Sequence, residues 1–234
     1  MLHRDNIQIK ENLKEVRKKI ETAARKAGRN PDEITLVAVT KTFRAEMVSA
    51  AVAAGITDVG ESKVQEGIAK IEQLGKITRW HLIGHLQSNK AAKAVAHFDM
   101  IQSLDTIELA EKVSELAARD GKRIECLIEI NSSGETEKFG MSPLVALETA
   151  DSIAALPGIK LRGLMTVGPL SDDSDMIKRA FEIGRAVFEK VKKNIGPDID
   201  ILSMGMSSDY ELAIGYGSTM IRIGSAIFGA RPRK

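Results

Sequence analysis

The sequence predicts an α/β protein, a (β/α)8 TIM barrel with an extra N-terminal helix. Short apolar runs rich in β-branched residues alternate with helical patterns along the chain, which favours a parallel sheet with helical crossovers. Eight such runs can be counted, and eight is the number of strands in a barrel of this kind. The run ITLVAVTK at residues 34–41 lacks the strict polar–apolar alternation of a half-exposed strand, so it is expected to be covered on both faces. A doubly wound open sheet is the alternative, which six strands would have favoured.

The chain opens with a predicted amphipathic helix over residues 5–27. Asp5 can cap its start, and Gly28 follows its end. Apolar residues recur at spacings of three and four, at Ile9, Leu13, Val16, Ile20 and Ala24. This stripe is expected to pack against the barrel.

The remaining elements follow in strict alternation. Strands are predicted at about residues 34–41, 57–61, 79–84, 99–104, 123–131, 159–167, 200–206 and 219–228. Helices are predicted at about residues 45–54, 63–74, 89–97, 106–120, 142–155, 173–194 and 209–215. No break in composition and no long linker divides the chain, so one domain over residues 1–234 is expected.

Composition excludes several classes of protein. The 34 basic and 32 acidic residues leave a net charge of +2, which gives no reason to expect nucleic acid or a membrane surface as a partner. No stretch approaches the roughly 18 apolar residues of a membrane span, and the N-terminal segment is too charged for a signal peptide. The single cysteine, Cys126, lies in an apolar run and is expected to be a buried, unreactive thiol. A cytoplasmic protein is therefore expected.

Lys41 is the first candidate functional residue, because it ends the first predicted strand. The carboxyl ends of barrel strands line the mouth where active sites lie. A desolvated lysine amine has a lowered pKa and can attack carbonyl groups. The alternative is a lysine that simply extends from the strand end into solvent.

The ends of the seventh and eighth predicted strands are candidates for a phosphate site. They comprise Gly205, Met206, Ser207, Gly224 and Ser225. Barrels commonly bind phosphate between the loops that follow these two strands, where glycine lets backbone N–H groups come close. Ser208 and Glu211 have the spacing of a capping box, which would leave the Ser207 hydroxyl for the site. Ordinary turn and cap residues are the alternative.

Arg222 interrupts the apolar eighth strand, and a buried arginine requires a partner. Glu61, Asp209 or an acceptor on a ligand could supply it. His81 and His85 lie in a strand-and-turn segment without cysteines or an acid cluster, so no zinc site is expected. The longest stretches without periodicity, residues 131–142 and 168–175, both follow strands, and the first could be a lid or simply mobile.

Six motifs stand in a fixed order along the chain: AVTK, VGESKVQE, WHLIGHLQSNK, GLMTVG, MGMSSDYELAIGYGST and RIGSAIFG. In these motifs the chain resembles the pyridoxal phosphate homeostasis protein family, which is similar to the N-terminal barrel of bacterial alanine racemase. The resemblance covers essentially the whole chain. It implies a fold-type III barrel for pyridoxal 5'-phosphate (PLP), without the second, β-rich domain of the racemase.

The resemblance also implies roles for single residues. Lys41 would form a Schiff base with the aldehyde of PLP, and Arg222 would face the pyridine nitrogen. Ser207, Gly224 and Ser225 would hold the phosphate, with Met206 beside the ring or phosphate. The family pattern GENYVQE is altered here, because Ser62 replaces an asparagine near the cofactor and Lys63 replaces a tyrosine. A cofactor contact at Ser62 could then require a bridging water.

Arg222 indicates what the bound cofactor could do. A guanidinium is always charged and can only donate, so it should keep the pyridine nitrogen unprotonated and weaken the ring as an electron sink. Lys41 could serve as one base, but neither Tyr210 nor Tyr216 is an evident second one. The resemblance therefore implies a monomeric PLP carrier or regulator in vitamin B6 homeostasis rather than an enzyme, with PLP-dependent apoenzymes as possible recipients. A low-activity amino acid racemase is the alternative, and a sugar-phosphate isomerase lacks a well-placed glutamate and histidine pair.

Overall fold

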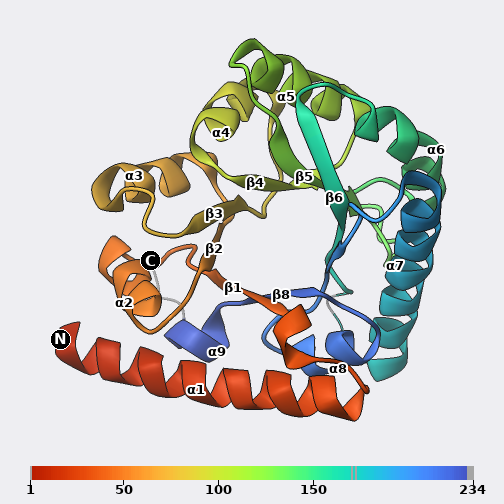
Figure 1. Cartoon of the computed structure of the whole chain (residues 1–234). Coiled ribbons are helices and arrows are strands. Elements are labelled where there is room, and N and C mark those ends of the chain that lie inside the picture. Colours follow the sequence, from red (N-terminus) through yellow and green to blue (C-terminus); the bar gives the residue numbers. More distant parts are fainter. Residues whose placement is uncertain (1, 170, 172, 231–234) are drawn as a thin grey trace.

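A closed barrel of eight parallel strands forms the centre of the molecule, with the helices outside it (Figure 1). The computed structural model describes residues 2–169, 171 and 173–230; Leu170 and Asp172, within the predicted loop 168–175, lie outside them. Each strand pairs with the next along the chain, and β8 pairs with β1. The predicted barrel is thus confirmed, and the open sheet is wrong.

The observed elements follow the predicted order. The strands are β1 Thr35–Val39, β2 Asp58–Glu61, β3 Arg79–Leu82, β4 Met100–Leu104, β5 Ile124–Ile130, β6 Ile159–Thr166, β7 Ile201–Ser203 and β8 Met220–Ile223. The helices are α1 Leu2–Lys26, α2 Ala45–Ala53, α3 Val64–Leu74, α4 Ala91–His97, α5 Ile107–Arg119, α6 Pro143–Ala154, α7 Ser174–Ile195, α8 Tyr210–Gly215 and α9 Ser225–Phe228. Two short 3₁₀ turns, Pro31–Glu33 and Ser88–Lys90, precede β1 and α4.

The main difference from prediction lies at the end of the chain. The eighth strand was expected to continue to residue 228, but it ends at Ile223, and the short helix α9 follows. The amides of Ile227 and Phe228 donate back to the carbonyl of Gly224, each at 2.9 Å. Both side chains are buried, and a buried apolar run this short has no periodicity that separates helix from strand. The first helix also begins before the expected Asp5 cap, at Leu2.

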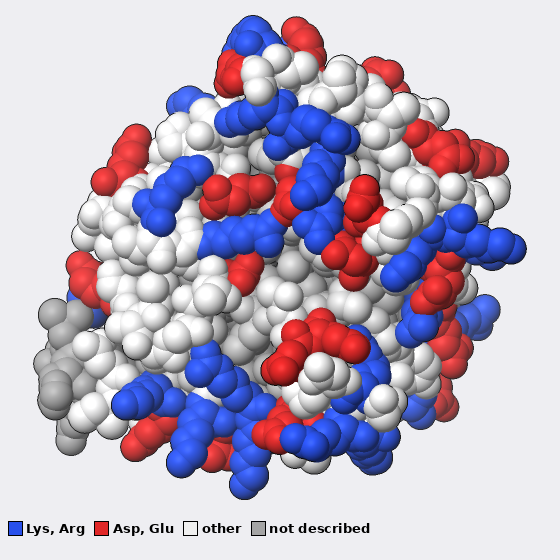
Figure 2. Space-filling view, in the orientation of Figure 1, with Lys and Arg blue, Asp and Glu red and all other residues white. Residues whose placement is uncertain are grey.

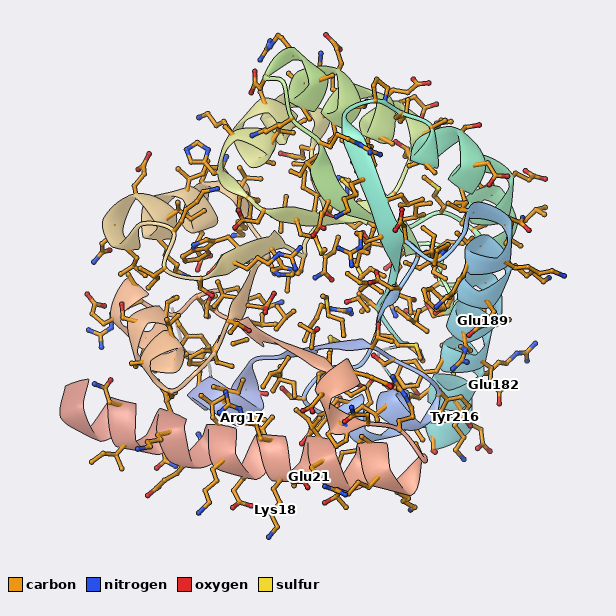
Figure 3. The ribbon with its side chains drawn as sticks, viewed as in Figure 1. Arg17, Lys18, Glu21, Glu182, Glu189 and Tyr216 are labelled. Atoms are coloured by element: carbon orange, nitrogen blue, oxygen red, sulfur yellow. The ribbon has the colours of Figure 1, made fainter. Side chains whose placement is uncertain are left out.

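The helix α1 closes a gap in the outer layer, beside α2, α8 and α9 (Figure 1). Its predicted apolar stripe is buried, at Ile9, Leu13, Val16, Ile20 and Ala24. Asn12 Nδ2 donates to the carbonyl of Ile227 at 2.8 Å, and Arg17 donates to the carbonyl of Gly55 at 2.6 Å. Figure 3 shows Arg17 on the side of α1 that faces the barrel and Lys18 on the opposite side. The extra helix is thus an integral part of the barrel wall.

Replacing Leu13 with alanine should therefore lower the free energy of unfolding by about 2–5 kcal/mol, the usual cost of a buried leucine cavity. Leu13 is only 1% exposed. Ile7, on the same helix, is 48% exposed, and Ile7→Ala should change the stability by no more than about 0.5 kcal/mol. Urea denaturation of both variants measures the difference. Equal losses would mean that α1 does not dock as described.

Side chains fill the inside of the barrel (Figure 3). An inner apolar cluster consists of Val37, Met100, Leu127, Met165, Ile201 and Met220. A larger apolar cluster lies between the strands and the surrounding helices. The barrel is therefore a packed core, and a ligand has to bind at one of its ends.

Charged residues of both signs meet at the amino ends of the strands. Glu125 pairs with Arg79, Lys160 and Arg162, and Arg162 also pairs with Asp200 at 2.6 Å. Figure 2 shows basic and acidic side chains intermingled over β4, β5 and β6, with neither sign dominating this face. Among the described helices, none is long and apolar enough to cross a membrane.

Candidate functional site

The candidate site residues lie on one continuous arc of the barrel mouth. They follow strands β1, β2, β7 and β8, and these strands are neighbours in the order β7, β8, β1, β2. The residues are Lys41, Ser62, Met206, Ser207, Gly224 and Ser225, together with Arg222 within β8. Lys41 and Ser225 are more than 180 positions apart in the sequence, and the barrel brings them to the ends of adjacent strands.

Lys41 lies in a tight turn just beyond β1, where it is half-buried. The amide of Phe43 donates to the carbonyl of Thr40 at 3.1 Å and closes this turn. Thr42 has φ of 71°, and it is the one non-glycine residue with positive φ in the described part of the chain. A β-branched residue rarely adopts this conformation, and such strain is characteristic of functional sites. The strand predicted to reach Lys41 thus ends two residues earlier, and a constrained turn presents the lysine.

Backbone donors converge between the ends of β7 and β8. The Ser207 hydroxyl accepts hydrogen bonds from the amides of Gly224 at 3.3 Å and Ala226 at 3.5 Å. A Cβ added at Gly224 would lie 3.3 Å from the carbonyl oxygen of Val39, so this loop is packed against the end of β1. A hydroxyl and two N–H groups in this arrangement are a donor set that suits an anion such as phosphate.

The capping box expected at Ser208 does not form. Helix α8 begins at Tyr210, with Asp209 in the N-cap position and Ser208 exposed. The Asp209 carboxylate instead accepts the amide of Met206 at 2.6 Å. The N-cap position is thus one residue later than expected, and the Asp209 side chain closes the preceding turn instead of capping the helix. The turn that carries Met206 and Ser207 is therefore held by Asp209.

Arg222 is buried, at 4% exposure, and it projects into the barrel. Its NH1 donates to Ser203 Oγ at 2.6 Å and its NH2 donates to the carbonyl of Thr166 at 2.8 Å. Burial lowers the pKa of Arg222 to about 10, while Glu129 and Asp209 favour its charge. The suggestion that Glu61 pairs with Arg222 is wrong, because Glu61 pairs with Lys70 at 2.6 Å.

A chain of buried hydrogen bonds continues from Arg222 through the barrel. Ser203 Oγ donates to Gln102 Oε1 at 2.7 Å, Gln102 Nε2 meets His81 Nδ1 at 2.9 Å, and His81 Nε2 meets Asp58 Oδ1 at 2.9 Å. Burial lowers the pKa of His81, so the ring is neutral and donates from Nε2 to Asp58. Its Nδ1 must then accept from the amide of Gln102. Each donor and acceptor role is thereby determined, and Ser203 is left to accept from Arg222.

Glu129 at the end of β5 is a site residue that the sequence analysis missed. It is 8% exposed, and its Oε2 has no hydrogen-bond partner among the described residues. Burial and the neighbouring Asp105 raise its pKa to about 7, while Arg222 opposes the shift. Its signal in the sequence is the second of two acids in the otherwise apolar run IECLIEI, the one near the carboxyl end of the strand. A carboxyl that is half-protonated near neutral pH can donate or accept a proton at the mouth.

Glu129 should make the stability of the protein depend on pH. Its folded-state pKa of about 7 lies above its ordinary value of 4.5, so the unfolded state loses this proton first. Stability contributed by the protonated form is complete below pH 4.5 and is lost as the pH rises through 7. Glu129→Gln should therefore gain stability relative to the wild type across this window, by up to about 3 kcal/mol. Urea denaturation at a series of pH values, with the exposed Glu137→Gln as control, tests this; a pH-independent difference would contradict it.

The loop 131–142 folds over the neighbouring ends of β5 and β6. Its last residues pair with β5, since Met141 donates to the carbonyl of Glu129 at 2.8 Å. Lys138 Nζ donates to the carbonyl of Gly168 at 2.9 Å, and Phe139 stacks on His85 with ring centroids 3.8 Å apart. The loop and the strand ends enclose a cavity of about 220 Å³ that includes Glu129. The loop is thus tied to the mouth at several points.

The class of protein follows from these features together with its relatives. The model of the family described as "Alanine racemase, N-terminal domain" matches residues 9–232, almost the whole barrel. Alanine racemase of Clostridium difficile has the same fold, with a TM-score of 0.80 over 97% of this chain and 58% of its own, at 16% identity.

Among the described residues, no group of three or more His, Cys, Asp or Glu could hold a metal ion.

Closer relatives specify the family. The pyridoxal phosphate homeostasis protein of Escherichia coli is 42% identical over 229 residues, 95% of this chain and 97% of its own. That of Haemophilus influenzae is 41% identical over 96% of this chain and 97% of its own. PipY of Synechococcus elongatus, solved with PLP bound, has a TM-score of 0.82 at 34% identity over 94% of this chain and all of its own. The chain belongs to the pyridoxal phosphate homeostasis protein family.

Proposed function

We propose that this protein binds PLP reversibly as a Schiff base on Lys41 and takes part in intracellular PLP (vitamin B6) homeostasis as a carrier or regulator. The observation that carries this proposal is the common placement of three groups at one arc of the mouth. They are the amine-bearing turn at Lys41, the buried donor Arg222 and the backbone donors around Ser207.

Each group suits a different part of PLP. The Ser207 hydroxyl would hold the phosphate together with Gly224, whose amide reaches that hydroxyl, and the adjoining Ser225. Arg222 would donate to the pyridine nitrogen, and Met206 and Ser62 would flank the cofactor. The Lys41 amine would condense with the aldehyde, forming a C=N bond and releasing one water without oxidation or reduction. Both ends of PLP would then be held by adjacent strands.

Arg222 supports a carrier rather than an efficient enzyme. PLP supplies an electron sink to enzymes that use it, and a protonated pyridine nitrogen strengthens that sink. With a pKa of about 10, Arg222 stays charged near neutral pH and can only donate there, so a pyridine nitrogen that faces it would stay unprotonated. The relatives at 41–42% identity are named homeostasis proteins, and a racemase is not favoured. Racemisation of an amino acid by the pure protein, lost in Lys41→Ala, would revive that alternative.

The remaining parts of the proposal concern the setting of the protein. We expect a single PLP-binding domain over residues 1–234 that acts as a monomer. PLP-dependent apoenzymes would receive the cofactor. The compartment would be the cytoplasm, in keeping with a buried cysteine, Cys126, that forms no disulfide.

Borohydride reduction in the presence of PLP tests the proposal. Reduction converts a Schiff base into a stable amine, so the phosphopyridoxyl group should remain on the protein after unfolding. Peptide mass mapping should find it on the peptide that contains Lys41. A label at another lysine, or none at all, would overturn the assignment of the anchor.

A further inference from the structure

Helix α3, which lies between β2 and β3, reaches across to the turn that carries Lys41. The ammonium of Lys70 donates to three oxygens: the carbonyl of Thr40 at 2.7 Å, Glu61 Oε1 at 2.6 Å and Glu66 Oε1 at 2.9 Å. An ammonium has three N–H donors, so all of them are used. The first of these bonds holds the peptide group that immediately precedes Lys41.

Glu66, one helical turn before Lys70, holds the peptide group on the other side of Lys41. The amide of Thr42 donates to Glu66 Oε1 at 2.5 Å. The same carboxylate oxygen accepts from Lys70. Residues four apart on a helix lie on one face, which is why one helix can reach both peptide groups. Lys41 is thus bracketed by two charge-assisted hydrogen bonds to α3.

The part of this hydrogen-bond network that lies deepest in the protein is buried. Lys70 is 6% exposed and Glu61 is 0% exposed, and Thr40 Oγ1 donates to Glu61 Oε1 at 2.5 Å. Burial raises the pKa of Glu61, and the Lys70 ammonium opposes that shift. Desolvation offsets much of the attraction in a buried ion pair, but removing one partner leaves the other charge buried and uncompensated. The pair therefore resists separation, and its hydrogen bonds keep the Thr40 carbonyl and hydroxyl in place.

The conformation that it holds is a strained one. Thr42, whose amide is bound by Glu66, has φ of 71°. A β-branched residue persists in the left-handed region only where its surroundings over-determine it. The bonds to Glu66 and Lys70 supply that constraint on both sides of Lys41. Without them the turn can relax toward an ordinary backbone conformation and move the lysine.

We propose that Lys70 and Glu66, with Glu61 beneath them, are positioning residues that fix the Lys41 turn for attack on a bound aldehyde. This inference rests on the proposed function of Lys41. Lys70 and Glu66 hold the two peptide groups that flank the lysine, and Glu61 holds Lys70 and the Thr40 hydroxyl. They should therefore control how readily the Schiff base forms. The phosphate cup, formed by Ser207, Gly224 and Ser225 after β7 and β8, should be unaffected.

Two ligands separate positioning from general damage. PLP reports on both the cup and Lys41. Its analogue 4-deoxypyridoxine 5'-phosphate has a methyl group in place of the aldehyde, so it reports on the phosphate and ring contacts but not on bond formation with Lys41. In Lys70→Met the apparent PLP affinity, measured from the visible absorption of the Schiff base, should fall about tenfold or more, since small displacements of a reacting group are costly. Affinity for the analogue, measured by calorimetry, should change less than about twofold.

Further variants make the comparison independent of one substitution. Glu66→Leu, at a half-buried position, should reproduce the selective loss, and Glu66→Gln should recover part of it because an amide oxygen can still accept from Thr42. Lys76→Met removes an exposed lysine that pairs with Asp99 just beyond α3, and it should bind both ligands like the wild type. Circular dichroism verifies that each variant is folded.

The outcomes are distinct. A selective loss of PLP affinity in both Lys70→Met and Glu66→Leu supports the inference. If the wild type forms its Schiff base but the variants lose affinity equally for both ligands, or neither variant loses affinity, the inference is overturned. A wild type that forms none overturns the proposed function, and the inference falls with it.

Discussion

Lys41→Ala should abolish the visible absorption band that the wild type develops with PLP. That band comes from the C=N bond between the cofactor and a lysine, and alanine has no amine to form it. Binding of PLP itself should weaken but persist, because the donors around Ser207 and the guanidinium of Arg222 remain. We expect the band to be lost entirely and the residual affinity to be detectable by calorimetry. Titration of both proteins with PLP measures this.

The control for this experiment is another lysine near the same strand ends. Lys63 is exposed and immediately precedes α3, so Lys63→Ala removes one amine without touching the Lys41 turn. It should retain the band. A band that survives in Lys41→Ala, or disappears in Lys63→Ala, would move the anchor away from the end of β1.

Arg222→Gln should reduce both stability and PLP affinity. The guanidinium donates to Ser203 and Thr166 and is the positive charge that faces Glu129 and Asp209. Its loss leaves buried acceptors and carboxylates without compensation, at a cost of about 2–5 kcal/mol. The charged donor expected at the pyridine nitrogen is replaced by a shorter, neutral amide, so the PLP affinity should fall and the band should shift. Urea denaturation and absorption titration measure the two effects.

A second arginine separates these two effects. Arg162 pairs with Glu125 and Asp200 at the amino ends of the strands, at the opposite end of the barrel from the mouth. Arg162→Gln should also lose stability, but its PLP affinity and spectrum should stay those of the wild type. If Arg222→Gln resembles Arg162→Gln in both measurements, Arg222 acts on the fold alone. An Arg222→Glu variant that folds should shift the band further, since a carboxylate favours a protonated pyridine nitrogen.

Much of the barrel could be predicted because its signals are local. Apolar runs and helical periodicity depend on neighbouring residues, so every strand of the barrel lies within its predicted segment. The segment 225–228 is the exception. Its two large apolar residues, Ile227 and Phe228, are buried, and the hydrogen bonds to Gly224 rather than any periodicity show that it is helical.

The grouping of the candidate site residues at one end of the barrel could also be predicted. Parallel strands bring their carboxyl ends to one face, so Lys41, Ser207 and Arg222 had to share an end of the barrel once the strands were assigned. Asp209 shows where this reasoning stops. The choice between Ser208 and Asp209 as the residue that closes a turn depends on a carboxylate reaching the amide of Met206, which spacing alone does not reveal.

The sequence by itself determined the eight strand–helix units and the strand ends at which the lysine, the arginine and the small residues lie, because periodicity and parallel topology are properties of short segments. Only the tertiary structure decided which side chains pair with one another. Arg222 could have paired with Glu61, but Glu61 is paired with Lys70, and Arg222 binds Ser203 and Thr166 instead. Pairing of this kind depends on the directions of side chains from different strands and helices, and those directions exist only once the barrel has closed.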